Sequence, residues 1–178
     1  DIAYPRALET EGLAHGATRP YALGRIVLWS ATRDARMLEL KDLADPAIGR
    51  IAIANPRHAP YGKRAEEALR AAGVWEAVQP RLVQGENIAQ TAQFVQTGNA
   101  AVGIIALSLA LNPTLAAQGG YTLIDAGLHE PLEQGFMLTR AAAGKPLATA
   151  FAEFIGSESA RAVLRRYGFE LPAVSAGR

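Results

Sequence analysis

The sequence predicts an α/β fold with a largely parallel sheet, because apolar segments of strand length alternate with segments of helical period. The chain has 178 residues, of which 49% are hydrophobic and 20% are charged. This length suits one ordinary domain or two small lobes with a genuine core. No internal repeat, low-complexity tract or flexible linker interrupts the pattern. If the chain forms two lobes, we expect strands rather than a tether to join them.

The strands are predicted from short apolar runs. The first spans residues 25–30 and is partly β-branched, and the second spans residues 49–55. The run 101–105 is apolar throughout, as expected for a strand that is covered on both faces. Two further strands are predicted over residues 121–125 and 135–139.

The helices are predicted from apolar residues that recur on one helix face. A short helical segment is expected over residues 38–45, between the first two strands. The helical period predicts one helix over residues 63–72 and another over residues 88–95. Beyond Leu147 the chain is predicted to form two more helices, and Ser157 is a candidate cap for the second of them.

Composition excludes several classes of protein. Eighteen Lys and Arg residues against 17 Asp and Glu residues give a net charge of +1, which is too balanced for a nucleic-acid-binding protein. The chain has no cysteine, and its three histidines are scattered, so we expect no metal-ion ligands and no cofactor. No apolar run approaches the roughly 20 residues that a membrane helix needs. The first residues do not form a signal peptide, which leaves export neither shown nor excluded.

Enzyme signatures are missing from the sequence. Ser108 lies outside any Gly-x-Ser-x-Gly context, and neither a Gly-x-Gly-x-x-Gly motif nor a P-loop occurs. No cluster of an acid, a base and a nucleophile is evident along the chain. We therefore expect a binding protein rather than an enzyme.

Two strand-to-helix junctions carry the candidate site. At the first, a strand ends at Asn55 and a helix begins near Pro60, which directs the N–H of Tyr61 out of the helix start. At the second, Asn87 is a plausible N-cap, so that the N–H of Ile88 points out of the next helix. Helix starts hold anions without a Lys or Arg, although most helix starts are simply capped and solvated. The pattern alone leaves both interpretations open.

The residues around these junctions resemble the periplasmic molybdate-binding proteins, the solute receptors of molybdate/tungstate ABC transporters. The signature stretch is residues 52–62, followed by the helix that ends at Gly73. The similarity covers essentially the whole chain. The other matching segments occur in the family's order, and they are residues 21–30, 40–46, 85–89, 98–105 and 157–172.

The resemblance implies a periplasmic-binding-protein type II architecture with two αβ lobes. Residues 1–30 plus 127–178 would form the first lobe, and residues 31–126 would form an intact second lobe. The family pattern begins with a strand-helix-strand unit that this chain lacks, so the first lobe is expected to be incomplete. That unit carries the Ser/Thr-bearing helix starts that supply the other half of the oxyanion cradle.

Carried over to this sequence, the resemblance implies main-chain N–H donors to the oxyanion at Tyr61 and Ile88. The protein would hold molybdenum only as the oxyanion, with no direct metal-ion ligand. Some members of the family add a tyrosine hydroxyl after the strand at residues 102–105. This chain has Ala106 there, so we expect that contact to be absent.

The expected function is therefore periplasmic binding of molybdate or tungstate for the membrane permease of an ABC importer. With half of the cradle missing, we expect the chain alone to bind molybdate in the millimolar range or not at all. We also expect it to self-associate through the incomplete lobe. The alternative is the effector-sensing domain of a bacterial transcription regulator, since such regulators share this lobe architecture. The sequence leaves open whether molybdate or tungstate is the preferred oxyanion.

Overall fold

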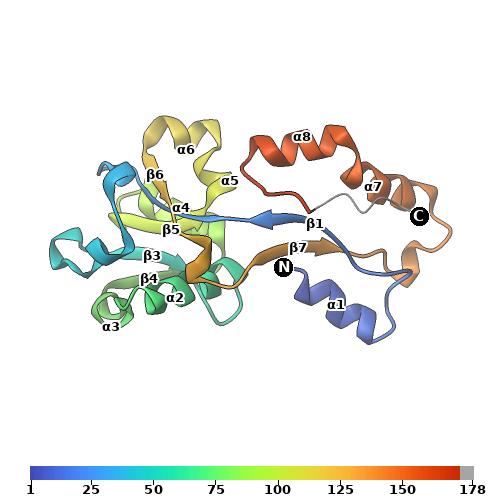
Figure 1. The fold of residues 1–178 in the computed structure, drawn as a ribbon, viewed down its shortest axis with the longest axis horizontal. Coiled ribbons are helices and arrows are strands. Elements are labelled where there is room, and N and C mark those ends of the chain that lie inside the picture. Colours follow the sequence, from blue (N-terminus) through green and yellow to red (C-terminus); the bar gives the residue numbers. More distant parts are fainter. Residues whose placement is uncertain (173–178) are drawn as a thin grey trace. The chain divides into compact units, whose positions relative to one another are not determined.

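The computed structural model describes residues 1–172 and divides them into two compact units (Figure 1). Unit 1 comprises residues 1–24 together with the described residues from Glu133 onward. Unit 2 comprises Arg25–Leu132, so that the chain enters and leaves it once.

Unit 2 is built on a five-stranded sheet in the order β4-β3-β5-β2-β6. Strand β3 pairs in parallel with β4 and β5, whereas β2 pairs antiparallel with β5 and β6. The strands are β2 (Ile26–Ser30), β3 (Ile51–Ala54), β4 (Leu82–Gly85), β5 (Val102–Ala106) and β6 (Gly120–Leu123).

The prediction of a largely parallel sheet holds for four of the five strands, whereas β2 lies within the sheet and runs against the other four. Strand β2 follows β1 (Arg19–Gly24) directly and pairs only with strands far along the chain. Two consecutive strands can pair in parallel only when a crossover connection joins them. No crossover joins β1 to β2, so the connection between them does not set the direction of β2 in its sheet.

Helices cover both faces of this sheet (Figure 1). One face packs against α2 (Pro60–Ala71) and α3 (Trp75–Val78). The other face packs against α4 (Ile88–Gln96), α5 (Leu107–Ala110) and α6 (Pro113–Gln118). The sheet is therefore buried on both sides, as α/β architectures require.

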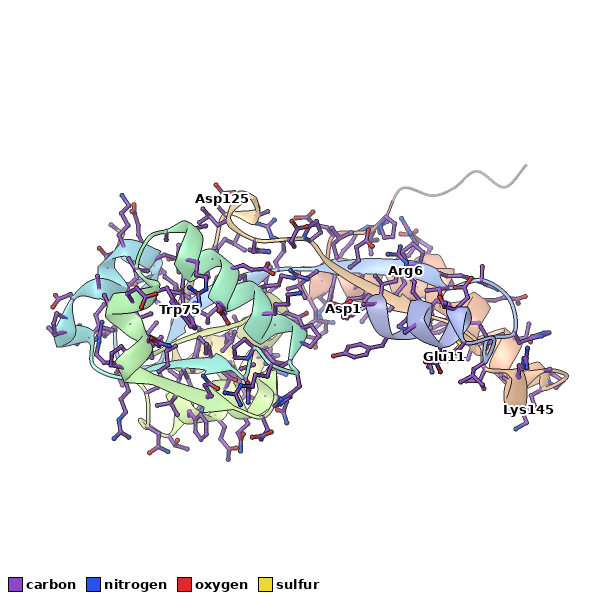
Figure 2. The ribbon with its side chains drawn as sticks, turned by 90° about the horizontal axis from the view of Figure 1, so that it is seen from below. Asp1, Arg6, Glu11, Trp75, Asp125 and Lys145 are labelled. Carbon is purple, nitrogen blue, oxygen red and sulfur yellow. The ribbon has the colours of Figure 1, made fainter. Side chains whose placement is uncertain are left out.

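The core of unit 2 follows the alternation of strand side chains. Along β2, Ile26 and Leu28 belong to the apolar cluster under α2, whereas Val27 and Trp29 belong to the cluster under α4. All five residues of β5 are buried, which confirms the prediction of a strand covered on both faces. Trp75 (Figure 2) is 7% exposed, and the Arg70 guanidinium lies 4.6 Å from the centre of its ring.

Short 3₁₀ turns complete unit 2. The segment predicted as helical over residues 38–45 forms the 3₁₀ turn η2 (Leu40–Ala44). The remaining 3₁₀ turns of the unit are η1 (Ala35–Met37), η3 (Pro46–Ile48), η4 (Gln79–Arg81) and η5 (Ala126–Leu128).

Both predicted boundaries between the lobes are wrong by several residues. Strand β2 was expected in the first lobe, but it lies between two strands of the unit 2 sheet and all of its residues are buried there. Residues 127–132 also belong to unit 2, where Leu132 is only 1% exposed within the core cluster. The unit boundaries fall after Gly24 and after Leu132.

Unit 1 contains a two-stranded sheet of β1 and β7 (Leu132–Phe136), with α1 (Ala3–Thr10), the 3₁₀ turn η6 (Arg140–Ala142), α7 (Pro146–Gly156) and α8 (Glu158–Arg166). Strand β7 begins and ends earlier than the predicted range 135–139. The Ser157 hydroxyl accepts the Ala160 N–H at 3.3 Å, which confirms Ser157 as the cap of α8. On α1, Arg6 (Figure 2) pairs with Glu133 at 3.5 Å.

Unit 1 leaves much apolar surface exposed. Helix α7 buries one of its 11 residues, Ala152, and α8 buries none. Leu147, Phe151 and Phe154 on α7 are 86%, 64% and 52% exposed. None of the helices within residues 1–172 has the length and apolar character needed to span a membrane.

Candidate functional site

The two predicted helix starts follow neighbouring strands of the sheet. Strands β3 and β4 are parallel, and their last residues, Ala54 and Gly85, are paired in register. One residue further along the chain, the Asn55 N–H donates to the Gly85 carbonyl at 2.8 Å. The loop from β3 to α2 and the loop from β4 to α4 therefore begin side by side, at the carboxyl ends of these two strands.

The chain turns in opposite directions from these two strand ends. Helix α2 leads from β3 to β4, whereas α4 leads from β4 to β5 on the other side of β3. The Tyr61 side chain packs against the core cluster under α2, and the Ile88 side chain packs against the cluster under α4. Such a switch point at the carboxyl ends of parallel strands is where open α/β sheets bind ligands.

Hydrogen bonds accepted by Asn55 shape the first junction. The Asn55 carbonyl accepts the Ala59 N–H at 2.9 Å, and the Asn55 side chain accepts the Arg57 N–H at 3.0 Å. Pro60 occupies the first turn of α2, and the N-cap Ala59 offers no side-chain cap. The first N–H groups of a helix have no partner within the helix, so α2 directs its amides out of its start.

Gly62 allows the first turn of α2 to pack closely against the main chain at the end of β3. A Cβ added at Gly62 would lie 2.6 Å from the Ala54 carbonyl carbon and 2.9 Å from the Asn55 carbonyl carbon. Real Cβ atoms do not approach main-chain carbons so closely. A glycine in the first turn of a helix is the sequence signal that could reveal this close approach.

The second junction is capped as predicted. The Asn87 side chain accepts the Gln90 N–H at 2.9 Å, which confirms Asn87 as the N-cap of α4. The Gln90 side chain in turn accepts the Glu86 N–H at 2.7 Å. Within residues 1–172, the Ile88 N–H has no hydrogen-bond partner. This amide lies at the first position of α4, where the helix dipole favours an anion.

A side-chain contact links the two junctions. The His58 Nε2 atom lies 3.0 Å from the Glu86 carbonyl oxygen and 3.3 Å from the Glu86 carboxylate. Both side chains are partly exposed, at 48% and 75%. Sequence reasoning missed this link, because no local pattern relates residues that lie on two different loops.

The described residues offer no metal-ion site. Among residues 1–172, no three His, Asp or Glu side chains gather in a way that could hold a metal ion. At the end of β5, Ala106 is 2% exposed and carries no hydroxyl. Beside the pair of His58 and Glu86, the groups at the starts of α2 and α4 are main-chain amides.

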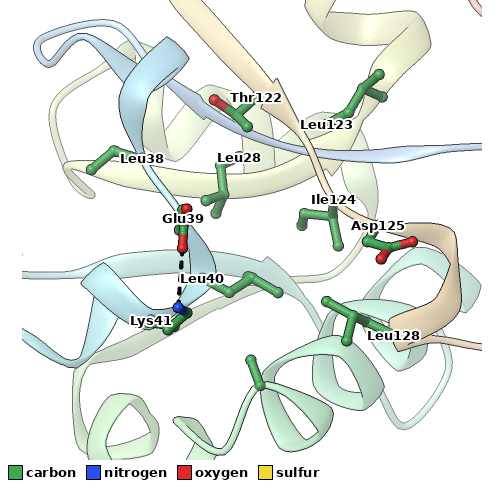
Figure 3. A pocket seen from close by; sticks show the side chains of 11 residues that line it. Leu28, Leu38, Glu39, Leu40, Lys41, Thr122, Leu123, Ile124, Asp125 and Leu128 are labelled. Carbon is green, nitrogen blue, oxygen red and sulfur yellow. Dashed lines mark ion pairs between the residues drawn. The ribbon is translucent and has the colours of Figure 1, made fainter.

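A cavity of about 460 Å³ beside β6 is a poor candidate for an anion site (Figure 3). Its charged lining residues Glu39 and Lys41 pair with each other at 3.4 Å, and the Asp125 carboxylate accepts the Gly127 N–H at 2.9 Å. Most of its other lining residues are apolar, and a desolvated anion is costly among apolar side chains. These apolar residues are Leu28, Leu38, Leu40, Ala72, Leu123, Ile124 and Leu128.

Comparison with known proteins defines the class. Residues 1–170 match the family model of the bacterial extracellular solute-binding proteins. The chain is 35% identical to the molybdate-binding protein ModA of Azotobacter vinelandii over 172 residues, which cover 96% of this chain and 68% of that protein. It is 34% identical to ModA of Rhodobacter capsulatus over 171 residues, with 95% and 66% covered.

A solved structure agrees with this result. The periplasmic molybdate-binding protein of Azotobacter vinelandii superposes with a TM-score of 0.87 at 30% identity, covering 97% of this chain and 76% of that chain. The fold is thus that of a periplasmic binding protein, in a class that binds solutes and is not enzymatic. Within this class, the chain belongs to the ModA family, and it spans about two thirds of the length of the two relatives above.

Proposed function

We propose that this chain forms part of the molybdate/tungstate receptor of an ABC importer, and that the N–H groups of Tyr61 and Ile88 donate to the oxyanion. One observation carries the proposal: in a member of the ModA family, two helix starts follow strand ends that are paired in register at the switch point of the sheet. This edge is where such sheets bind ligands.

Main-chain donors suit a tetrahedral dianion. Two helix starts supply N–H groups and partial positive charges, so the anion needs no Lys or Arg partner. The side chains of Tyr61 and Ile88 then matter little for the hydrogen bonds themselves. Molybdate, tungstate and sulfate carry the same charge, so we expect the size of the site to discriminate among them.

Transport requires the rest of the receptor. In a complete two-lobed receptor, closure of the lobes would trap the anion, and the closed form would dock on the membrane permease. The segment absent from this chain would supply the remaining donors, so we propose that binding by these 178 residues alone is weak. The alternative role in a transcription regulator has no specific observation in its favour.

Replacing the cap of α4 tests the site. We expect Asn87→Ala to cost about 1 kcal/mol of stability and to fray the start of α4, because an N-cap fixes the first turn. In a ¹H–¹⁵N NMR titration with millimolar molybdate, the wild-type amides of Tyr61 and Ile88 should shift. The response of Ile88 should be strongly reduced in the variant.

The matched control is Asn112→Ala. Asn112 caps α6 in the same way, by accepting the Thr114 N–H at 3.0 Å. Urea denaturation should show a similar loss of stability, while the molybdate response of Tyr61 and Ile88 stays at its wild-type level. If molybdate shifts neither amide in a longer chain that includes the family's leading strand-helix-strand unit, the proposed site is overturned.

We also propose that the chain self-associates through the exposed apolar face of α7. Apolar surface of this kind favours contact with another chain. Light scattering should show an average mass that rises with protein concentration, and replacing Leu147 and Phe151 by Gln should lower it. Met37→Gln is the control, since Met37 is 81% exposed but lies in unit 2. A wild-type mass that stays monomeric at high concentration would contradict this prediction.

A further inference from the structure

The carboxylate of Glu67 joins helix α2 to a distant part of unit 2. Both of its oxygens accept hydrogen bonds from Arg64 Nη1, at 2.6 and 2.7 Å. Its Oε2 atom also accepts the main-chain N–H of Glu130 at 3.0 Å. Glu130 lies between η5 and β7, in the segment through which the chain leaves unit 2.

Burial makes this arrangement specific. The Arg64 side chain is 11% exposed and the Glu67 side chain is 27% exposed. A buried guanidinium needs a charged partner, and Glu67 is the carboxylate that pairs with Arg64 within residues 1–172. Within residues 1–172, the Arg64 Nε atom is buried and has no hydrogen-bond partner. The charge of Arg64 is therefore balanced through its Nη1 atom, which donates to Glu67.

The charges around Glu67 favour its ionised form. Partial burial acts to raise the pKa of the Glu67 carboxyl, but the hydrogen bonds from Arg64 and from the Glu130 N–H outweigh it. The positive charges of Arg64 and Lys63 act in the same direction. The pKa of Glu67 therefore lies below its ordinary value, and the carboxylate keeps its charge and its hydrogen bonds to lower pH than a free Glu would.

Glu67 and Tyr61 belong to the same 12-residue helix. A packed helix moves as a rigid element, so a displacement at its start is carried to its middle. The segment through which the chain leaves unit 2 ends at Leu132, whose side chain is 1% exposed and is packed in the core cluster. The hydrogen bond to the Glu130 N–H is therefore a connection between the start of α2 and this segment.

We infer that Glu67 is a positioning residue for the oxyanion site, which fixes α2 to the segment through which the chain leaves unit 2. Anion binding at Tyr61 is then transmitted to Glu130. This role rests on the proposed function, whereas the mechanical connection can be tested without any ligand.

The ligand-free test is an NMR pH titration of the wild-type chain. When the pH falls through the lowered pKa of Glu67, its carboxylate becomes neutral, and its hydrogen bonds to Arg64 and Glu130 weaken. We expect the amides of Glu130 and Gly62 to shift with one common midpoint, below the ordinary Glu value of 4.5. The Glu67→Gln variant should lose this transition, and Glu67→Asp should restore part of it.

The control is Glu66→Gln. The Glu66 side chain is also 27% exposed, and it pairs with Arg70 on the same helix, at 2.8 Å from Arg70 Nε. This variant removes one ion pair of α2 but not the link to Glu130, so the common transition should persist. If Glu130 and Gly62 show no common transition in the wild type, the connection is refuted without recourse to any variant.

Molybdate separates this inference from the proposed function. We expect the Glu130 amide to respond together with Tyr61 and Ile88 in the wild type and in Glu66→Gln, and to lose its response in Glu67→Gln. A wild-type Glu130 that stays unchanged while Tyr61 and Ile88 respond would refute the role of Glu67 and leave the receptor proposal standing. If no amide responds even in a longer chain that includes the family's leading strand-helix-strand unit, the receptor proposal and this role of Glu67 are both overturned.

Discussion

The 178-residue chain should bind molybdate at least about a thousandfold more weakly than the Azotobacter vinelandii relative, of which it spans 68%. A hydrogen bond to a charged group contributes about 1.5–3 kcal/mol, so a leading unit that supplies even three donors would account for about 4–9 kcal/mol. That contribution corresponds to about three to six orders of magnitude in affinity. Isothermal titration calorimetry of both proteins in the same buffer should show binding by the chain in the millimolar range or no binding at all.

The control for this experiment is a longer chain that includes the family's leading strand-helix-strand unit. We expect that chain to regain most of the missing affinity, because the added helix starts supply the absent donors. The mass of each sample must be measured by light scattering, since two chains could complete each other's site. Tight binding by a monomeric 178-residue chain would contradict the prediction.

Gly62→Ala should lower the free energy of unfolding by about 3 kcal/mol, the upper part of the range for overpacked sites. The new Cβ would lie 2.6 Å from the Ala54 carbonyl carbon and still closer to its oxygen. Strand β3 cannot move away from the new Cβ, because it is paired with β4 on one side and β5 on the other. The helix propensity of alanine would return only about 1 kcal/mol, so the clash dominates.

Urea denaturation measures this effect, and Gly156→Ala in α7 is its control. A Cβ at Gly156 would meet no atom within 4 Å, so this variant should be as stable as the wild type or slightly more stable. Because Gly62→Ala moves the start of α2, it should also abolish the molybdate response of Tyr61. Equal stability of Gly62→Ala and the wild type would show that α2 can shift without cost.

The predicted elements with strong local signals were confirmed. The apolar run at residues 101–105 forms β5 within one residue at each end, and the helical period at residues 63–72 falls on α2 and its C-cap, Ala72. The short elements without such signals were missed. Strand β4 has only four residues and is partly exposed at the edge of the sheet, so its sequence carries no long apolar run.

The positions of Tyr61 and Ile88 in the chain could be predicted, because Pro60 and Asn87 mark helix starts within a few residues. That the two junctions follow paired strand ends could not be predicted from these residues. It depends on the register of β3 with β4, in which Ala54 lies opposite Gly85. The role of these amides in oxyanion binding stays a prediction.

By itself, the sequence determined the α/β class, the helix caps and the places where strands give way to helices. These features arise from interactions among residues a few positions apart, which the order of residues records directly. Only the tertiary structure decided the reversed direction of β2, the unit boundaries at Gly24 and Leu132, and the bond between Glu67 and Glu130. These depend on contacts between residues far apart along the chain, whose free energy is set by the packing of the whole unit rather than by any local pattern.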